Sequence, residues 1–278
     1  MDHRKVLILG KGFIGTRICQ ELQCDIDEEM ISRYEDAEKL VKKHNPKILI
    51  NCIGFTGTKN VDGCEEKKNQ TLLANVFIPI MLAEVALRHD IKFVHISSGC
   101  IYHYDFERDE PIPEIKPPDF FDLFYSRSKM YCEGSLGMIE EKYRMLALRL
   151  RIPLDDRPHP RNLLTKLISF GRVIDIPNSI SYIPDFIEML RHLIEKDAFG
   201  IYNTVNKGAL RYPELLDVYK KYRPDFDYSV IPIKDLNLVR TNLVLSTEKL
   251  EKSGFHVRDI NEILEECVGT YLESEVAK

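Results

Sequence analysis

A glycine-rich turn between a buried strand and a helix constrains this chain more than any other feature of its sequence. Residues 5–9 form a short apolar run, and residues 10–15 then read G-x-G-x-x-G at the start of helically spaced apolar positions. Glycine permits the tight turn, lets the backbone approach a pyrophosphate and lets the helix pack closely on the strand. The pattern predicts a dinucleotide-binding loop, with an unliganded glycine-rich turn as the alternative. The residues predicted to contact the cofactor here are Gly10, Gly12, Phe13, Ile14 and Gly15.

Strand-like and helix-like patterns alternate along the first half of the chain. The expected strands cover residues 5–9, 48–50, 92–96 and 145–150. The expected helices cover residues 13–22, 34–45, 69–89 and 125–143. This alternation predicts an α/β fold with a doubly wound parallel sheet, whose ligand lies in the crevice at the carboxyl ends of the strands.

The alternation loosens after residue 151, where prolines mark irregular chain. A strand-like run at 201–203 and helical patterns at 213–222 and from 259 follow. We predict a nucleotide-binding core over residues 1–151 and a small C-terminal lobe over 152–278. That lobe is expected to bind substrate and to return some segments to the core.

Composition excludes several classes of protein. The net charge of −5 argues against a nucleic-acid binder, which usually carries a basic surface. No apolar run is expected to span a bilayer, and the N-terminus enters a strand without a signal peptide, so a cytoplasmic location is expected. The seven cysteines are dispersed, without a CxxC pair or a Cys/His cluster of zinc spacing. We therefore expect reduced thiols, no metal site and no membrane partner.

The choice of cofactor is expected to depend on the end of the second strand, where NAD enzymes place an acidic residue on the ribose hydroxyls. The sequence favours residues 31–33 as that strand end. Ser32 and Arg33 suit a 2′-phosphate, because a guanidinium pairs well with phosphate oxygens. NADP(H) is therefore the predicted cofactor and NAD(H) the alternative. Arg33 could also be a solvated residue at a helix start.

A tyrosine and a lysine are spaced for joint chemistry. Tyr125 and Lys129 form Y-x-x-x-K at a helix start, which places both side chains on one helical face. An ammonium beside a phenol favours the phenolate and so makes tyrosine a usable proton donor or acceptor. Upstream, Ser98 closes a predicted strand and could donate to the same substrate oxygen. The alternative for this common pattern is a surface Tyr–Lys pair.

With these residues in this order, the whole chain resembles the extended short-chain dehydrogenase/reductase family. Residues 242–250 further resemble the end of dTDP-4-dehydrorhamnose reductases. The resemblance implies a Rossmann fold, a Ser98–Tyr125–Lys129 site and a homodimer through the helix that carries Tyr125. The family's extended members usually have G-x-x-G-x-x-G, so this loop is one residue shorter. The further cofactor-binding residues implied are Asn51, Gly54 and Asn75, together with Tyr125 and Lys129.

A closer resemblance is to the plant and viral nucleotide-rhamnose epimerase/reductases. The shared stretches are residues 54–57, 60–62, 64–65, 99–101, 160–162, 165–166, 175–179 and 200–203. GDP-fucose synthases also carry a cysteine at the place of Cys100. The resemblance implies that Cys100 and Lys166 are the epimerase pair, although which of them is the acid stays open. Lys166 could instead be a solvated helical lysine, and His159 is another candidate proton carrier. The predicted substrate-binding residues are Thr56, Asp62, Glu65, Arg161 and Asn162, and the alternative for Asp62 and Glu65 is that they cap the long helix.

The chemistry of a 4-keto-6-deoxy sugar suits these residues. Its ketone acidifies the C3 and C5 protons, so one group can remove a proton from one face and another can return it from the opposite face. We therefore expect a bifunctional 3,5-epimerase/4-reductase that converts UDP-4-keto-6-deoxy-glucose to UDP-rhamnose with NADPH. The alternatives are a reductase of dTDP- or UDP-4-keto-rhamnose alone, and a non-catalytic, NADP-binding regulatory subunit.

Overall fold

The computed structural model of the protein describes residues 5–143, 145–236 and 238–276, and these divide into two compact units. The first unit contains the residues up to 101, 117–149 and 191–202. The second contains 102–116, 150–190 and the residues from 203 onward. Residues 102–116, which the expected boundary at 151 assigned to the core, thus cluster with the second unit, and 191–202 return to the first.

A single parallel sheet of six strands is the centre of the first unit, with the order β2-β1-β3-β4-β5-β9. Its strands are β1 (Val6–Leu9), β2 (Asp25–Asp27), β3 (Ile48–Asn51), β4 (Lys92–Ser98), β5 (Leu146–Leu150) and β9 (Gly200–Asn203). β1 pairs with β2 on one side and with β3 on the other, and Leu9 is level with Asp27 and Asn51. The predicted doubly wound parallel sheet is confirmed. Its order reverses between β1 and β3, and a crevice for ligands is expected at that point.

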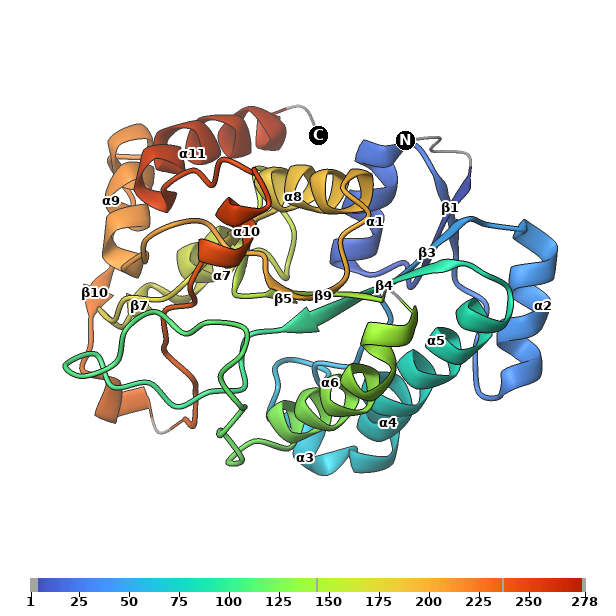
Figure 1. The fold of residues 1–278 in the computed structure, drawn as a ribbon. Helices are drawn as coiled ribbons and strands as arrows, with labels where there is room; N and C mark the ends of the chain where they lie inside the picture. The colour runs from blue at the N-terminus through green and yellow to red at the C-terminus, as the bar shows by residue number, and fades with distance from the viewer. Residues whose placement is uncertain (1–4, 144, 237, 277–278) are drawn as a thin grey trace. The chain divides into compact units, whose positions relative to one another are not determined.

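Helices cover both faces of this sheet (Figure 1). They are α1 (Phe13–Leu22), α2 (Tyr34–His44), α3 (Gly63–Glu66), α4 (Lys68–Leu72), the π-helix η2 (Leu73–Phe77), α5 (Ile78–Arg88), α6 (Phe124–Tyr143) and the end of α8 (Ile183–Glu195). α2, α5 and α6 pack side by side on one face, and α1 covers the other (Figure 1). The apolar positions of α2 (Ala37, Leu40 and Val41) recur at helical spacing and are buried against the sheet.

The segment from Lys68 to Arg88 corrects one expectation from the sequence. Its 21 residues are long and apolar enough to cross a membrane by length and composition, and it is the one such helix among the described residues. Of its most apolar stretch, 56% is buried, and α5 packs on α2, α6 and β4. These contacts are those of a core helix, which passes the same test of length and apolarity.

The second strand lies six residues earlier than its predicted end. β2 ends at Asp27, and Arg33 is the N-cap residue of α2. The prediction of a strand end at 31–33 is therefore wrong. β2 has only one apolar residue between two aspartates, and it is an edge strand, so no hydrophobic pattern marks it. Its pairing with β1 decides where it lies.

The second unit has its own apolar core, built from short elements. Two parallel strand pairs, β6 (Pro153–Leu154) with β8 (Ser181–Tyr182) and β7 (Arg172–Val173) with β10 (Ser229–Val230), accompany the helices. The helices wholly within it are α7 (Leu163–Phe170), α9 (Tyr212–Tyr222), η3 (Ile233–Leu236), α10 (Glu248–Lys252) and α11 (Ile260–Val276). Leu164, Leu216 and Ile263 are fully buried in this core.

Candidate active site

The glycine loop joins β1 to α1 in a turn that only glycine can make. Gly10 has a φ of +102°, and a side-chain carbon on it would lie 2.8 Å from the backbone nitrogen of Ile53. A side-chain carbon on Gly15 would lie 2.0 Å from the carbonyl oxygen of Gly10. Gly12, by contrast, has nothing within 4 Å of that position, and no side chain caps α1 there. The loop is thus closed against β3 and open at a helix N-terminus, which suits a pyrophosphate.

The predicted cofactor residue Asn51 is fully buried at the end of β3. Its side-chain oxygen accepts the Ile53 N–H at 3.0 Å, and its amide nitrogen donates to His95 Nδ1 at 3.1 Å. Burial holds the pKa of His95 well below its ordinary value, so the ring is neutral with its proton on Nε2. Nε2 lies 3.7 Å from Cys132 Sγ. The structure therefore places Asn51 in a buried polar chain that shapes the exit of β3, a role that the sequence did not predict.

Tyr125 and Lys129 lie on α6, and both side chains are buried. Lys129 reaches the exit of β3, because a side-chain carbon on Gly54 would lie 3.7 Å from its Nζ. Burial is the main cause that lowers the pKa of Lys129 below its ordinary value. Four nearby groups oppose this shift by favouring the ammonium, namely Cys132, Glu133, Cys100 and Cys64. A buried ammonium close to ionisable groups is the arrangement expected of an active site.

Asn75 connects the exit of β3 to α6. It lies in the π-helix η2, a type of turn that is frequent at functional sites. Its side-chain oxygen accepts the Phe55 N–H at 2.7 Å, and its amide nitrogen donates to the Phe55 carbonyl at 2.9 Å and to Ser128 Oγ at 3.0 Å. Ser128 Oγ donates in turn to the Tyr125 carbonyl at 2.7 Å. Asn75 therefore holds the loop after β3 against the turn of α6 that carries Tyr125.

The end of β4 places a hydroxyl and a thiol next to each other. Ser98 is the last residue of β4, and its Oγ accepts the Cys100 backbone N–H at 3.2 Å. Cys100 is half-buried, and it is one of the groups that favour the ammonium form of Lys129 and so oppose the lowering of its pKa. The first unit thus brings the predicted residues Gly54, Asn75, Lys129 and Cys100 to one edge of the sheet.

Helix α6 is held to the sheet by a buried ion pair that the sequence analysis did not single out. Glu133, one turn after Lys129, accepts from the Arg149 guanidinium, with 3.0 Å between Nε and Oε2. Both side chains are at least 95% buried, and Ser97 Oγ donates to Glu133 at 3.1 Å. Losing one partner of such a pair leaves an uncompensated buried charge. Because Glu133 and Arg149 are far apart in the sequence, only the fold reveals the pair.

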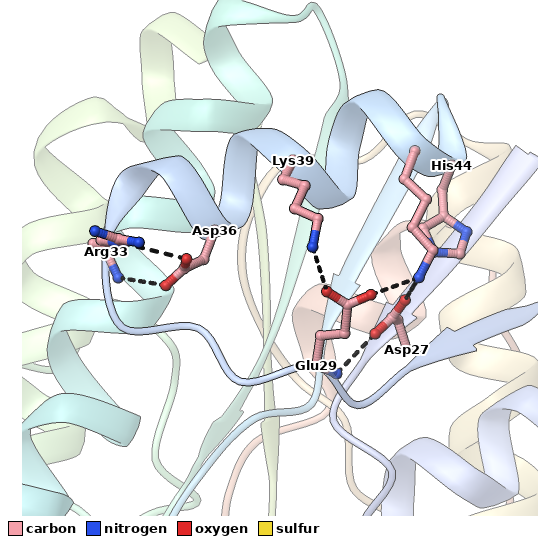
Figure 2. A network of polar contacts seen from close by, with 7 residues as sticks. Asp27, Glu29, Arg33, Asp36, Lys39 and His44 are labelled. Carbon is pink, nitrogen blue, oxygen red and sulfur yellow. Dashed lines mark hydrogen bonds and ion pairs between the residues drawn. The ribbon is translucent and has the colours of Figure 1, made fainter.

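The end of β2 carries an acidic residue where NAD enzymes place one, but its oxygens are already bound (Figure 2). Asp27 Oδ1 accepts the Glu29 N–H at 2.8 Å, while Oδ2 lies 2.9 Å from both Lys43 Nζ and His44 Nε2. Burial alone would raise the pKa of Asp27, yet these hydrogen bonds outweigh it and hold the pKa well below the ordinary value.

Arg33 lies at the other end of the same network and is exposed. Its guanidinium is 3.5 Å from Asp36 Oδ1, and its backbone N–H donates to Asp36 Oδ2 (Figure 2). A second basic side chain, Lys11 of the glycine loop, lies 3.6 Å from Glu28, the residue after β2. Lys11 therefore lies near the end of β2, where the Asp27 carboxylate is used internally, whereas Arg33 lies beside Asp36 at the start of α2.

The loop after β3 carries the predicted substrate residues Thr56 and Asp62. A tight turn lies between them, because Gly57 has a φ of +74° and a side-chain carbon there would lie 1.8 Å from the Asn60 carbonyl. The Asp62 N–H donates to Asn60 Oδ1 at 3.0 Å. Thr56 and Asp62 are half-buried. The third predicted residue of this loop, Glu65, contacts helix α6 instead of facing open space.

The second unit holds the remaining predicted residues around the start of α7. Lys166 is half-buried, and its pKa is lowered first by burial and then by the neighbouring charge of Arg161. Arg161 is exposed, and its backbone N–H donates to His159 Nδ1 at 3.0 Å. A lysine whose pKa is lowered is a plausible proton carrier in chemical terms.

Asn162 lies directly before α7, and its side chain is fully hydrogen-bonded. It is the N-cap of α7, and its side-chain oxygen accepts the N–H groups of Asp155 and Leu164 at 3.0 and 3.2 Å. Its amide nitrogen donates to the carbonyls of Asp155 and Arg157 at 2.8 and 2.9 Å. An amide side chain has two donors and two acceptor positions, and all four are used here. The structure therefore shows Asn162 holding the start of α7, and its substrate contact stays a prediction.

Comparison with known proteins fits this geometry. A family model described as RmlD substrate binding domain matches residues 4–169. The chain belongs to this family. Within it, the chain is an extended short-chain dehydrogenase/reductase-like protein, so the predicted resemblance is confirmed. A bifunctional dTDP-4-dehydrorhamnose 3,5-epimerase/dTDP-4-dehydrorhamnose reductase from Arabidopsis thaliana is 30% identical over 277 residues, covering 93% of this chain and 90% of that protein.

Longer relatives contain a region that is similar to this chain. A trifunctional UDP-glucose 4,6-dehydratase/UDP-4-keto-6-deoxy-D-glucose 3,5-epimerase/UDP-4-keto-L-rhamnose-reductase of Arabidopsis thaliana is 31% identical over 277 residues. The match covers 94% of this chain and 41% of that protein, so the chain spans about two fifths of its length.

Solved structures share the fold of this RmlD-family member. The crystal structure of a UDP-rhamnose synthase from Acanthamoeba polyphaga mimivirus aligns with a TM-score of 0.86 at 24% identity, covering 95% of this chain and 98% of that one. A dTDP-4-dehydrorhamnose reductase from Bacillus anthracis in complex with NADP aligns with a TM-score of 0.81 at 19% identity, covering 96% and 98%. At these identities the alignments establish the fold.

Proposed function

We propose that the chain epimerises C3 and C5 of UDP-4-keto-6-deoxy-glucose and reduces C4 with NADPH, giving UDP-rhamnose. The observation that carries the proposal is the position of Lys129, which shares a helix face with Tyr125 and lies buried among thiols that include Cys100. A reductase pair and a candidate epimerase thiol thus meet at one edge of the sheet. The match along nearly the whole length of a bifunctional epimerase/reductase supports both activities in a chain of this extent.

The residues at the start of the chain fit a dinucleotide. The turn closed by Gly10 and Gly15 leaves the backbone open at Gly12, where the N–H groups that begin α1 would hold the pyrophosphate. Lys11 and Arg33 would pair with a 2′-phosphate, since the Asp27 carboxylate is bound to Lys43 and His44. This arrangement favours NADPH over NADH. When bound, the cofactor supplies the hydride that reduces C4.

Side chains of this protein supply the proton that the C4 oxygen takes up during the reduction. We assign Tyr125 as the acid that protonates the C4 oxygen and Ser98 as a donor of a hydrogen bond to the same oxygen. The Lys129 ammonium stabilises the phenolate that Tyr125 leaves behind, and burial strengthens this attraction by excluding water. Asn75 and Ser128 hold the backbone of Tyr125 in place for the transfer.

The epimerisation is assigned to Cys100 and Lys166. One of them removes the proton beside the ketone and the other returns a proton to the opposite face, once at each carbon. The lowered pKa of Lys166 makes its neutral form more accessible than that of an exposed lysine. Reduction then follows on the inverted sugar.

The test is incubation with UDP-4-keto-6-deoxy-glucose and NADPH in D₂O, followed by the near-ultraviolet absorbance of NADPH and by NMR of the product. We expect NADPH oxidation and deuterium at C3 and C5 of a rhamnosyl product. Cys100→Ala should lose the deuterium incorporation and still bind NADPH. Oxidation of NADPH only when pre-epimerised 4-keto-rhamnose is supplied would indicate a reductase alone. Cofactor binding without oxidation or exchange would indicate a regulatory subunit.

A further inference from the structure

We propose that Glu65 is a positioning residue that fixes the first turn of α6, and with it Tyr125, rather than a residue that binds the sugar. The role of Tyr125 in this inference rests on the proposed function. Glu65 lies on the short helix α3, 59 residues before α6 in the sequence. The contact between these two elements is the basis of the inference.

The Glu65 carboxylate uses both oxygens on α6. Oε1 accepts the backbone N–H of Phe124 at 2.6 Å, and Oε2 lies 3.7 Å from Nη2 of Arg127. Arg127 also donates to the Phe121 carbonyl at 2.6 Å, just before the helix begins. The carboxylate and the guanidinium are therefore paired with each other, and each also binds a backbone group at the start of the helix.

Physical chemistry explains why a carboxylate belongs there. The first N–H groups of a helix have no partner within the helix, and the helix dipole favours a negative charge at this end. Phe124 is the first residue of α6, and its N–H finds its partner in Glu65. The Phe124 ring is flanked by two cations, Lys68 at 5.5 Å and Arg127 at 5.4 Å from its centroid. Glu65 thus sets the position of the residue directly before Tyr125.

A second anchor acts on the same turn, after Tyr125 in the sequence. Asn75 binds both polar groups of the Phe55 backbone and donates to Ser128, which donates to the Tyr125 carbonyl. The loop from Phe55 to Glu65 is therefore attached to α6 on both sides of Tyr125. Because a misplacement of about 1 Å can cost about 100-fold in rate, loss of the Glu65 anchor should act on turnover.

The two possible roles of Glu65 predict opposite kinetics. A residue that binds the sugar equally in ground and transition states raises KM when it is removed and leaves kcat unchanged. A residue that positions Tyr125 lowers kcat and leaves KM nearly unchanged. We expect Glu65→Ala to lower kcat for reduction by about 10- to 100-fold with KM within about twofold.

Glu65→Gln provides the conservative rescue. It keeps an oxygen that can accept the Phe124 N–H and loses the ion pair with Arg127, so it should restore most of the turnover lost in Glu65→Ala. Glu66→Ala is the matched control, because Glu66 is the neighbouring glutamate on α3 and is exposed. It should retain the kinetics of the unaltered chain.

Amide hydrogen exchange, measured by mass spectrometry on the whole chain with NADPH, tests the anchor without any sugar. Exchange at residues 124–128 should accelerate in Glu65→Ala and not in Glu66→Ala. Raised KM with unchanged kcat, or unchanged exchange at the start of α6, would overturn the inference. If the unaltered chain fails to reduce the keto sugar while Glu65→Ala still accelerates exchange, the proposed function fails and the anchoring of α6 stands.

Discussion

The two lysines assigned to the proposed chemistry lie in surroundings of opposite charge. Lys129 is buried on α6 of the first unit, near thiols and the Glu133 carboxylate, all of which favour its protonated form. Lys166 is half-buried on α7 of the second unit, and the charge that acts on it is the cation of Arg161, which favours its neutral form. Burial lowers both pKa values, but the neighbours oppose that shift at Lys129 and add to it at Lys166.

The difference in neighbouring charge matches the two chemical roles proposed for these lysines. A lysine that stabilises a phenolate must keep its proton, whereas a lysine that exchanges protons with a sugar must be able to release it. The supports differ as well. Lys129 lies within a helix of 20 residues that contacts the sheet, while Lys166 lies on a helix of eight residues whose start is held by Asn162. The two lysines therefore differ in the charge of their neighbours and in the length of the helix that carries them.

The largest effect is expected from Tyr125→Phe, which removes the proposed acid and leaves both lysines. Reduction should fall by up to about 10⁴-fold, because general acid catalysis at one group contributes about 10²- to 10⁴-fold. Deuterium exchange at C3 and C5 should continue, since it depends on Cys100 and Lys166. Stopped assays of NADPH oxidation and NMR in D₂O measure the two activities separately. If Tyr125→Phe lost deuterium exchange as well as reduction, the assignment of reduction to Lys129 and of exchange to Lys166 would be wrong.

Lys129→Met should separate catalysis from stability. Reduction should fall by about 10²-fold or more because the phenolate loses its ammonium. The free energy of unfolding should stay equal or rise, since a buried charge is replaced by an apolar side chain of similar length. Because folding lowers the pKa of Lys129, the unfolded chain binds more protons between the lowered pKa and the ordinary lysine value of 10.5. The stability gained by Lys129→Met is therefore present near neutral pH and shrinks as the pH rises toward 10.5. Urea denaturation at several pH values measures the free energy of unfolding of both chains. A marked loss of stability in Lys129→Met at neutral pH would contradict the view that burial of the Lys129 charge costs stability.

Lys166→Arg keeps a cation on α7 that cannot deprotonate. Deuterium exchange at both carbons should fall by about 10²-fold, while reduction of pre-epimerised 4-keto-rhamnose persists. In the unaltered chain, exchange that rises with pH through the lowered pKa would identify Lys166 as the base, and exchange that falls would identify it as the acid. Full exchange in the arginine variant would exclude both roles and return Lys166 to a helical surface lysine.

The smallest effect is expected from Asn162→Ala, which removes the support of Lys166. Loss of the cap and of the buried hydrogen bonds should lower the free energy of unfolding by about 1–3 kcal/mol. Asn162→Asp keeps the acceptor and loses the donated bonds, so its loss should be smaller. Urea denaturation gives the ranking. If the alanine variant kept its stability and raised KM for the nucleotide sugar, Asn162 would be the substrate contact that the sequence predicted.

Local sequence patterns gave much of the first unit correctly. The apolar spacing from Phe13 to Leu22 has the same bounds as α1, and the long helix predicted over 69–89 is found as α4, η2 and α5. The edge strand β2 escaped prediction because three residues with one apolar side chain carry no periodic signal. The π-helical turn that buries Asn75 was not foreseen either.

What the sequence determined by itself is whatever depends on neighbours along the chain: the glycine turn, the periodic helices and the shared face of Tyr125 and Lys129. The tertiary structure alone decided the contacts between distant segments, such as Glu65 with Phe124, and the environment that separates Lys129 from Lys166. The physical reason is the distance along the chain over which each interaction acts. Backbone propensity and helical periodicity act over a few residues, whereas burial, pairing of charges and hydrogen bonds at helix ends depend on which segments the fold brings together.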